Sequence, residues 1–156
     1  MQQTLIIVKP DGVQRGLIGK IISRFEDRGL QIIGMKMMHI SQALAKDHYA
    51  VHKGKPFYDG LIRFMTGGPV VVLALQGNNA IDVSRKMMGA TFGFKAEPGT
   101  IRGDFGLSSS CNLIHGSDSP EAAAAELARF FSRTELVEYK LTSLDWVYDF
   151  SGGQPQ

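Results

Sequence analysis

One short stretch of the chain combines side chains suited to handling phosphate. In the segment CNLIHGSDSPEAAAAELARFF, His115 lies between an apolar run and the signals for a helix start. Those signals are a hydroxyl cap at Ser119, Pro120 at the first helical position and Glu121 in the first turn. Because a helix N-terminus attracts anions, His115 is either a turn histidine beside a cap or a nucleophile at an anion site.

A carboxylate on the same predicted helix has two interpretations. The core face of that helix is marked by Leu127, Phe130 and Phe131. Glu126 flanks this face, where its carboxylate can fix the tautomer of His115 as an orienting group does for an activated nucleophile. Alternatively, Glu126 pairs with Arg129 three positions on, an interaction worth only about 0.2–0.5 kcal/mol. The sequence leaves both interpretations open.

Three cations at element ends and in a long loop are candidates for binding phosphate. Lys9 ends the first apolar run, Arg85 lies on a helical pattern, and Arg102 lies in GTIRGDF. Each alone is typical of a solvated surface charge. Together with His115 they suit a polyphosphate, since arginine offers bidentate N–H···O geometry and lysine a compact charge.

The usual motifs for phosphate or metal binding are absent. In GLIGK the glycines are too close for a P-loop, and Ile21 stands where Ser or Thr is needed. His48 and His52 are four apart on one helical face, but no glutamate follows His48 as the zincin pattern requires. A packed or solvated histidine pair is therefore favoured, and no protein ligands are assigned to a metal.

Composition is that of one globular domain. The 156 residues are 44% hydrophobic and 21% charged, and the net charge of +2 is too slight to indicate nucleic-acid binding. Residues 1–150 are expected to form the domain and residues 151–156 a flexible tail. A single cysteine, Cys111, favours a reducing compartment, so we expect a cytoplasmic protein. MQQTLIIVKP lacks the basic start of a signal peptide, and no apolar run is long enough to cross a bilayer.

Hydrophobic periodicity predicts alternating strands and helices. The predicted elements are a strand ending near Lys9, turn chemistry at DGVQRG, a helix over 17–25 closed by Gly29, a strand over 30–40, two short helices within 41–65, a strand over 69–77, a helix from an Asn79 cap to Met88, an irregular loop over 89–110, a strand at 112–114 and a helix after Ser119. This order predicts an α+β fold, a ferredoxin-like split βαβ sandwich with an antiparallel four-stranded sheet covered by helices. A doubly wound parallel sheet is the alternative, but there are few strands for it.

Four segments in the right order resemble the nucleoside diphosphate kinases. They are KPDGVQRG, GPVV, PGTIRGDF and NLIHGSDS, within a resemblance that covers about residues 4–147. The resemblance implies a ping-pong reaction in which His115 takes the γ-phosphate of a nucleoside triphosphate and passes it to a different nucleoside diphosphate. It also implies Mg²⁺ that bridges the phosphates and arrives with the nucleotide. A homo-oligomer, usually a hexamer, is implied as well, with neither a membrane nor a specific nucleic acid as partner.

The same resemblance assigns roles to individual residues. The residues that resemble the family's phosphate and ribose ligands are Lys9, Arg85, Thr91, Arg102 and Asn112. Tyr49 matches the tyrosine beside the histidine, and Ser117 with Glu126 matches the pair that positions the imidazole. Phe57 matches the aromatic residue on which the base stacks, with Leu61 beside it.

Two segments depart from the family pattern. In TFGFKAEPGT, Gly93 replaces a proline that is common in the family's turn, and SSSC places Ser109 where an apolar residue often contacts the base. The alternative to an enzyme is a non-catalytic nucleotide-binding regulatory protein on the same fold. Loss of the histidine or of a phosphate ligand would mark such a protein, and none is lost here.

Overall fold

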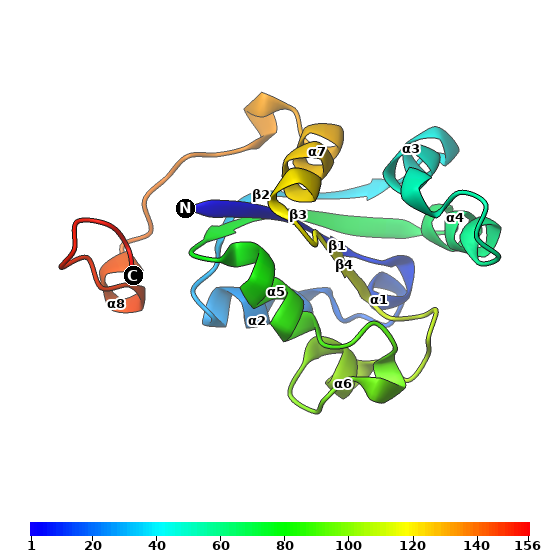
Figure 1. Cartoon of the computed structure of the whole chain (residues 1–156), viewed down its shortest axis with the longest axis horizontal. Coiled ribbons are helices and arrows are strands. Elements are labelled where there is room, and N and C mark those ends of the chain that lie inside the picture. Colours follow the sequence, from blue (N-terminus) through cyan, green and yellow to red (C-terminus); the bar gives the residue numbers. More distant parts are fainter.

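A computed structural model describes residues 1–156 as one antiparallel sheet with helices on both faces (Figure 1). The strands are β1 (Gln2–Val8), β2 (Gln31–His39), β3 (Pro69–Gly77) and β4 (Ile114–Gly116). Their order is β2-β3-β1-β4, and each neighbouring pair is antiparallel. The predicted α+β split βαβ sandwich is confirmed, and the parallel-sheet alternative is wrong.

Short helices connect and cover these strands. The α-helices are α1 (Pro10–Gln14), α2 (Ile18–Asp27), α3 (Gln42–His48), α4 (Tyr58–Thr66), α5 (Ala80–Met88), α6 (Ile101–Phe105), α7 (Pro120–Phe130) and α8 (Leu144–Val147). Three 3₁₀ turns are η1 (Ala50–His52), η2 (Gly93–Lys95) and η3 (Arg133–Glu135). None of the helices has the length and apolar character needed to cross a bilayer.

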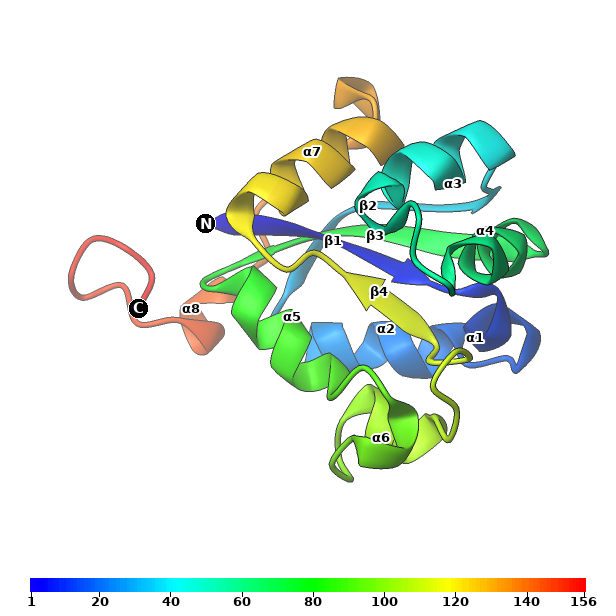
Figure 2. The same cartoon turned by 45° about the vertical axis from the view of Figure 1, so that its right-hand side comes forward.

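The central strand β1 divides the core into two layers. Leu5 and Ile7 pack with residues of α3, α4 and α7, while Ile6 and Val8 pack with residues of α2 and α5. Figure 2 shows α3 and α7 on one face of the sheet and α2 and α5 on the other. All four β1 residues are fully buried, which explains why this strand reads as a continuous apolar run. His115 pairs with Ile7, and directly paired residues share a face. The sheet therefore presents His115 to the α7 side.

The predicted turn at DGVQRG is instead the short helix α1. Pro10 occupies its first position, and the Arg15 amide donates to the Asp11 carbonyl at 3.0 Å. A Cβ added at Gly12 would lie 2.8 Å from Cγ1 of Val8. Glycine here lets the helix pack closely against the strand end, whereas sequence reasoning took the Asp-Gly pair as a turn signal.

Two further local predictions are wrong. Asn79 does not cap α5 with its side chain, because its backbone is left-handed with φ of 51°. The segment 89–110, predicted as irregular, contains η2 and α6. The start of α6 is capped by Thr100, whose hydroxyl accepts from the Gly103 amide at 3.0 Å. The abundance of glycine in this segment hid that helix.

The last strand is displaced from its predicted position. It begins at Ile114 rather than at residue 112, because Leu113 has φ of 71° and this left-handed conformation cannot continue a strand. His115 therefore lies inside β4, between strand hydrogen bonds, rather than in the junction that precedes α7.

Candidate active site

Helix α7 begins with the N-terminal cap that the sequence predicted. The Ser119 hydroxyl accepts from the Ala122 amide at 3.0 Å, and Pro120 takes the first helical position. Leu127 and Phe130 are buried against the sheet at 7% and 3% exposure. With its start capped and its apolar face buried, α7 turns Glu126 toward β4.

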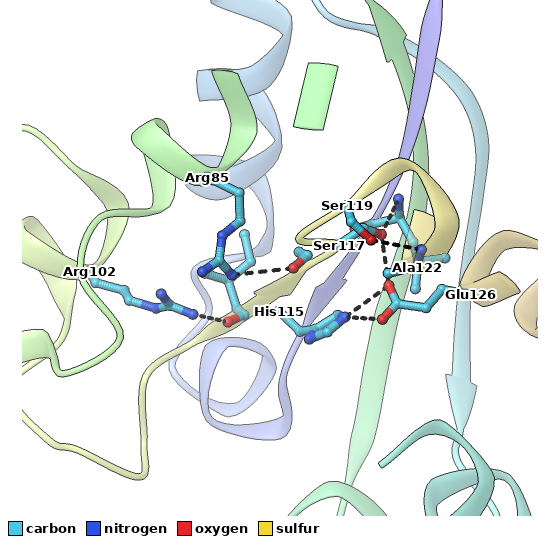
Figure 3. Close-up of polar contacts among 10 residues, drawn as sticks. Arg85, Arg102, His115, Ser117, Ser119, Ala122 and Glu126 are labelled. Carbon is cyan, nitrogen blue, oxygen red and sulfur yellow. Dashed lines mark hydrogen bonds and ion pairs between the residues drawn. The ribbon is translucent and has the colours of Figure 1, made fainter. Parts of the chain in front are cut away.

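His115 and Glu126 form the centre of the site (Figure 3). Nε2 of His115 lies 3.1 Å from both Oε1 and Oε2 of Glu126. Because an ionised carboxylate can only accept hydrogen bonds, Nε2 carries the ring proton. Nδ1 then keeps an unprotonated lone pair. The alternative pairing of Glu126 with Arg129 is wrong, since Arg129 pairs with Asp47 of α3.

Ser117 holds the other side of the carboxylate. Its hydroxyl donates to Oε2 of Glu126 at 2.7 Å, and its amide donates to the Leu5 carbonyl at 3.1 Å. Burial by itself would raise the pKa of Glu126. The hydrogen bonds from His115 and Ser117, together with electrostatic attraction from the histidine side chains beside it, outweigh burial and lower that pKa. Glu126 is thus held ionised and fixed in position.

Arg102 is buried and braces the backbone around the site. Its guanidinium donates to three carbonyls, those of Asn112 at 3.1 Å, Gly89 at 3.0 Å and Ile114 at 2.7 Å. Burial, and then the charge of Arg85, lowers the pKa of Arg102 to about 10. The sequence predicted a phosphate ligand at this position, and the structure adds a structural role that spacing did not reveal.

Lys9 lies beside Arg102, and both side chains bind Asn112. Its Nζ donates to Oδ1 of Asn112 at 2.7 Å, and Nδ2 of Asn112 donates to the Thr91 carbonyl at 2.9 Å. Burial, followed by the charge of Arg102, lowers the pKa of Lys9 to about 8. Four of the predicted ligands are therefore linked in one network.

Arg85 and Thr91 are the exposed members of the predicted ligand set. Nη1 of Arg85 donates to the Gly116 carbonyl at 3.4 Å, a long contact that leaves the guanidinium accessible to solvent (Figure 3). The Thr91 carbonyl already accepts from Asn112, so the groups that remain available to a ligand are the exposed guanidinium of Arg85 and the exposed side chain of Thr91.

Asp11 is a site residue that sequence reasoning missed. Its Oδ2 accepts from the amide of Leu113 at 3.0 Å, while the Lys9 amide donates to the Leu113 carbonyl at 2.8 Å. A left-handed backbone is rare for a bulky residue and persists where its surroundings hold it. Asp11 thus fixes the bend that leads into His115. The only signal was KPDG, which reads equally well as a turn.

An aromatic cluster packs behind the histidine. Ring centroids of His48 and Tyr49 lie 4.7 and 6.2 Å from that of His115. Tyr49 is 5% exposed, and burial followed by the charge of Glu126 raises its pKa. Burial also lowers the pKa of His48, to about 3, so that ring is neutral. Tyr49 was predicted at the site, whereas His48 had been assigned to a packed or solvated pair.

Further rings extend from this cluster to an exposed aromatic surface. His52 stacks on Tyr49 with centroids 6.3 Å apart and contacts Phe57 edge-on at 5.3 Å. Phe57 is 53% exposed, whereas Leu61 packs partly buried against the core. The site is open on this side. A cavity of about 650 Å³ lies elsewhere, between β2 and the segment that includes Tyr139.

The fold and the site together define a class of protein. A histidine with one free nitrogen, backed by a carboxylate and flanked by arginine and lysine, is suited to phosphotransfer with a nucleotide. A family model described as nucleoside diphosphate kinase matches residues 2–136. The chain belongs to the nucleoside diphosphate kinase family.

Individual relatives are similar in sequence or structure to nearly the whole chain. A nucleoside diphosphate kinase of Carboxydothermus hydrogenoformans is 56% identical over 149 residues, which are 96% of this chain and 100% of that protein. The structure of a halophilic nucleoside diphosphate kinase from Halobacterium salinarum, in complex with CDP, aligns with a TM-score of 0.93. It is 49% identical and covers 95% of this chain and 99% of its own. A Babesia bovis family member aligns with a TM-score of 0.92 at 43% identity, covering 95% and 100% of the two chains.

Family membership establishes the type of activity. The protein is a nucleotide-binding phosphotransferase with the catalytic kinase role of its relatives, rather than a regulatory protein without activity. Membership also implies a general requirement for a divalent metal ion.

Proposed function

We propose that His115 carries the phosphate between the two nucleotides of a ping-pong exchange. The observation that carries this is the contact of Nε2 with Glu126, which leaves Nδ1 as the nucleophile. The Nδ1 lone pair forms a bond to the γ-phosphorus while the bond to the bridging oxygen breaks. That oxygen leaves with its electron pair on the nucleoside diphosphate. The Nε2 proton stays beside Glu126, whose charge stabilises the positive ring, and a second diphosphate reverses the step.

The cations around β4 are proposed to hold the phosphates. Charge in phosphoryl transfer lies on the phosphate oxygens, so positioning and electrostatic stabilisation dominate catalysis. Arg102 uses three of its five N–H groups on carbonyls, which leaves two for a ligand. Lys9 and Arg85 supply further charge, and Thr91 with Asn112 supplies neutral polar groups for phosphate and ribose.

Mg²⁺ is proposed to bind mainly to the nucleotide phosphates. Two carboxylates near β4 are held by the protein itself: Glu126 binds His115 and Ser117, and Oδ2 of Asp11 accepts from Leu113. The other oxygen of Asp11 has no hydrogen-bond partner but is buried, so it is not presented to solvent. We therefore assign no protein carboxylate to the ion, which on the phosphates would neutralise their negative charge.

The exposed ring of Phe57 is the proposed platform for the base, with Leu61 beside it. Stacking suits every base, because each has a π-face, and contributes on the order of 1–3 kcal/mol. We therefore expect the enzyme to accept purine and pyrimidine nucleotides.

The two-step mechanism is tested by isolating the phosphorylated enzyme. After brief exposure to γ-labelled ATP and Mg²⁺, the protein freed of nucleotide should carry acid-labile phosphate on Nδ1 of His115, identified by ³¹P NMR and peptide mapping. That label should pass to the diphosphates of A, G, C, U and T with rates that differ by far less than a thousandfold. Label on another residue, or transfer confined to one base, would contradict the proposal.

Glu126→Gln is expected to lower kcat by about 10–100-fold, with little change in KM for the nucleotide. The substitution removes a charged hydrogen bond of about 1.5–3 kcal/mol that stabilises the positive ring during transfer. Steady-state kinetics measure it. Glu121→Gln, a neutralisation at an exposed position of the same helix, is the control and should match wild type. An equal loss in both variants would assign the effect to the net charge of α7.

The activity is expected to fall above about pH 8, where unliganded Lys9 loses its charge. A neutral amine attracts phosphate less, so kcat/KM should decline on the basic side, and Lys9→Arg should flatten that limb. A pH profile of kcat/KM that is identical in wild type and Lys9→Arg would exclude Lys9 as the titrating group.

The stability of the fold is expected to change with pH in the opposite direction. Between about pH 8 and 10.5 the unfolded chain binds the Lys9 proton more tightly than the folded one, so this residue's contribution to the unfolding free energy rises with pH.

We also propose a homo-oligomer, with a hexamer as the expected state. Phe92 and Phe94 are 44% and 60% exposed and lie nearly parallel, with centroids 6.0 Å apart. Neither packs into the core of its own chain, so a subunit contact is the remaining way to bury them. Light scattering at micromolar protein distinguishes a hexamer from a dimer or monomer.

Finally, we propose a cytoplasmic location. The single cysteine, Cys111, is free and exposed, which suits a reducing compartment. Cell fractionation tests this directly, and recovery of the protein outside the cytoplasm would contradict it.

A further inference from the structure

His48 is a buried histidine whose two ring nitrogens both lack a hydrogen-bond partner. It lies at the end of α3 and is 8% exposed. An unpaired buried polar atom costs free energy, and the proposed transfer reaction does not use this ring. A ligand that binds one of its nitrogens would remove that cost.

The ring of His48 lies against the catalytic pair. Its centroid is 4.7 Å from that of His115, with the rings inclined at 78°. One donor atom each from His48, His115 and Glu126 lie within 4.8 Å of one another. Two imidazoles and one carboxylate form a ligand set typical of Zn²⁺ sites that keep a fourth position open.

The distances allow metal binding after a small movement. Donors around a tetrahedral Zn²⁺ lie roughly 3.3 Å apart, given bonds of about 2.0–2.1 Å. Closing a separation of 4.8 Å to that spacing needs a shift of about 1–1.5 Å. No hydrogen bond holds the His48 ring, so rotation of its side chain can supply that shift.

We propose that His48, His115 and Glu126 form a site for a divalent transition-metal ion of the Zn²⁺ type, and that the bound ion blocks the nucleophile. The ion enters between Nε2 of His115 and the carboxylate, so the Nε2 proton must leave. In the neutral ring it moves through solvent to Nδ1, with no net proton release. Nδ1 then has no lone pair for phosphorus. This blocking rests on the proposed role of His115, whereas metal binding does not.

The ligand chemistry separates this ion from the Mg²⁺ of the nucleotide. Mg²⁺ prefers six oxygen ligands in octahedral geometry and keeps several waters, whereas imidazole suits Zn²⁺, Cu²⁺ and Ni²⁺. Excess Mg²⁺ should therefore not displace the inhibitory ion.

Co²⁺ is a spectroscopic probe for this site. Metal-free protein, without nucleotide, is titrated with Co²⁺ while its visible d–d absorption is recorded. We expect one ion per chain, displaced by Zn²⁺ and not by Mg²⁺. His48→Phe, which keeps a ring of similar size, should lower the affinity for Co²⁺ more than about 100-fold. Mutating a residue that only supports a metal ligand already lowers metal affinity about 10–100-fold, and His48 is a direct ligand in the proposed site. His52→Asn, at the neighbouring histidine outside the cluster, should bind Co²⁺ like wild type.

Glu126→Gln provides a second variant if His48→Phe fails to fold, and it should also lose binding. Zn²⁺ should inhibit wild-type phosphotransfer and spare His48→Phe. A wild-type protein that binds no Co²⁺, or variants that bind it as tightly, would overturn the site. Binding without inhibition would overturn the blocking step. If Co²⁺ binds as expected but no phosphate ever forms on His115, the proposed function fails while the metal site stands.

Discussion

His115→Ala should lower the rate of phosphotransfer at least about 10⁴-fold, since loss of a covalent nucleophile leaves only binding and charge stabilisation. The variant should still bind nucleotide, because the cations around β4 stay in place. Acid-labile labelling by ATP should disappear with the activity. Coupled assays and labelling in parallel samples measure both effects.

The fold should survive this change, because His115 is only partly buried and its hydrogen bond is to a side chain. Circular dichroism and the melting temperature check this. His39→Ala, at an exposed position at the end of β2, controls for general loss of a histidine and should keep full activity. Labelling of His115→Ala at the wild-type level would show that another group carries the phosphate.

Arg102→Lys should lower the unfolding free energy by about 2–4 kcal/mol, although the charge is kept. A lysine can reach at most one of the three carbonyls that Arg102 binds, and a buried carbonyl left unpaired costs about 1–3 kcal/mol. Urea denaturation at a fixed protein concentration measures the loss. The activity should fall as well, because Asn112 and Ile114 lose a partner close to His115.

Arg85→Lys is the matched control, since Arg85 is exposed and makes one long contact of 3.4 Å. Its unfolding free energy should stay within about 0.5 kcal/mol of wild type. If both lysine variants were equally stable, the carbonyl contacts of Arg102 would contribute nothing, and its role would be limited to binding the ligand.

The features that the sequence revealed are those with local causes. The Ser119–Pro120 cap, the continuous apolar run of β1 and the closing Gly29 all act within a few residues, and each appears in the structure as predicted. Four-stranded antiparallel topology followed from the order of such elements. The five-residue helix α6 is too short to show that periodicity, and glycines surround it, which is why 89–110 was read as a loop.

The features that the sequence hid depend on contacts between distant segments. Asp11 fixes the backbone of Leu113 from 102 positions away in the sequence. No local sequence pattern predicts a left-handed backbone conformation at a leucine. The burial of Arg102 depends on where α6 docks, so the sequence indicated either a solvated surface charge or a phosphate ligand there. His48 looked like half of a histidine pair because its spacing to His52 was visible, whereas its contact with His115 was not.

The carbonyls on either side of His115 each accept a hydrogen bond from one of the two arginines. Ile114 accepts from Arg102 at 2.7 Å, and Gly116 accepts from Arg85 at 3.4 Å. The three-residue strand β4 is thus coupled to Arg102 through a short, buried hydrogen bond and to the exposed Arg85 only through a long one. We expect a displacement of β4 to carry His115 and Arg102 together, while Arg85 keeps the freedom to follow a ligand.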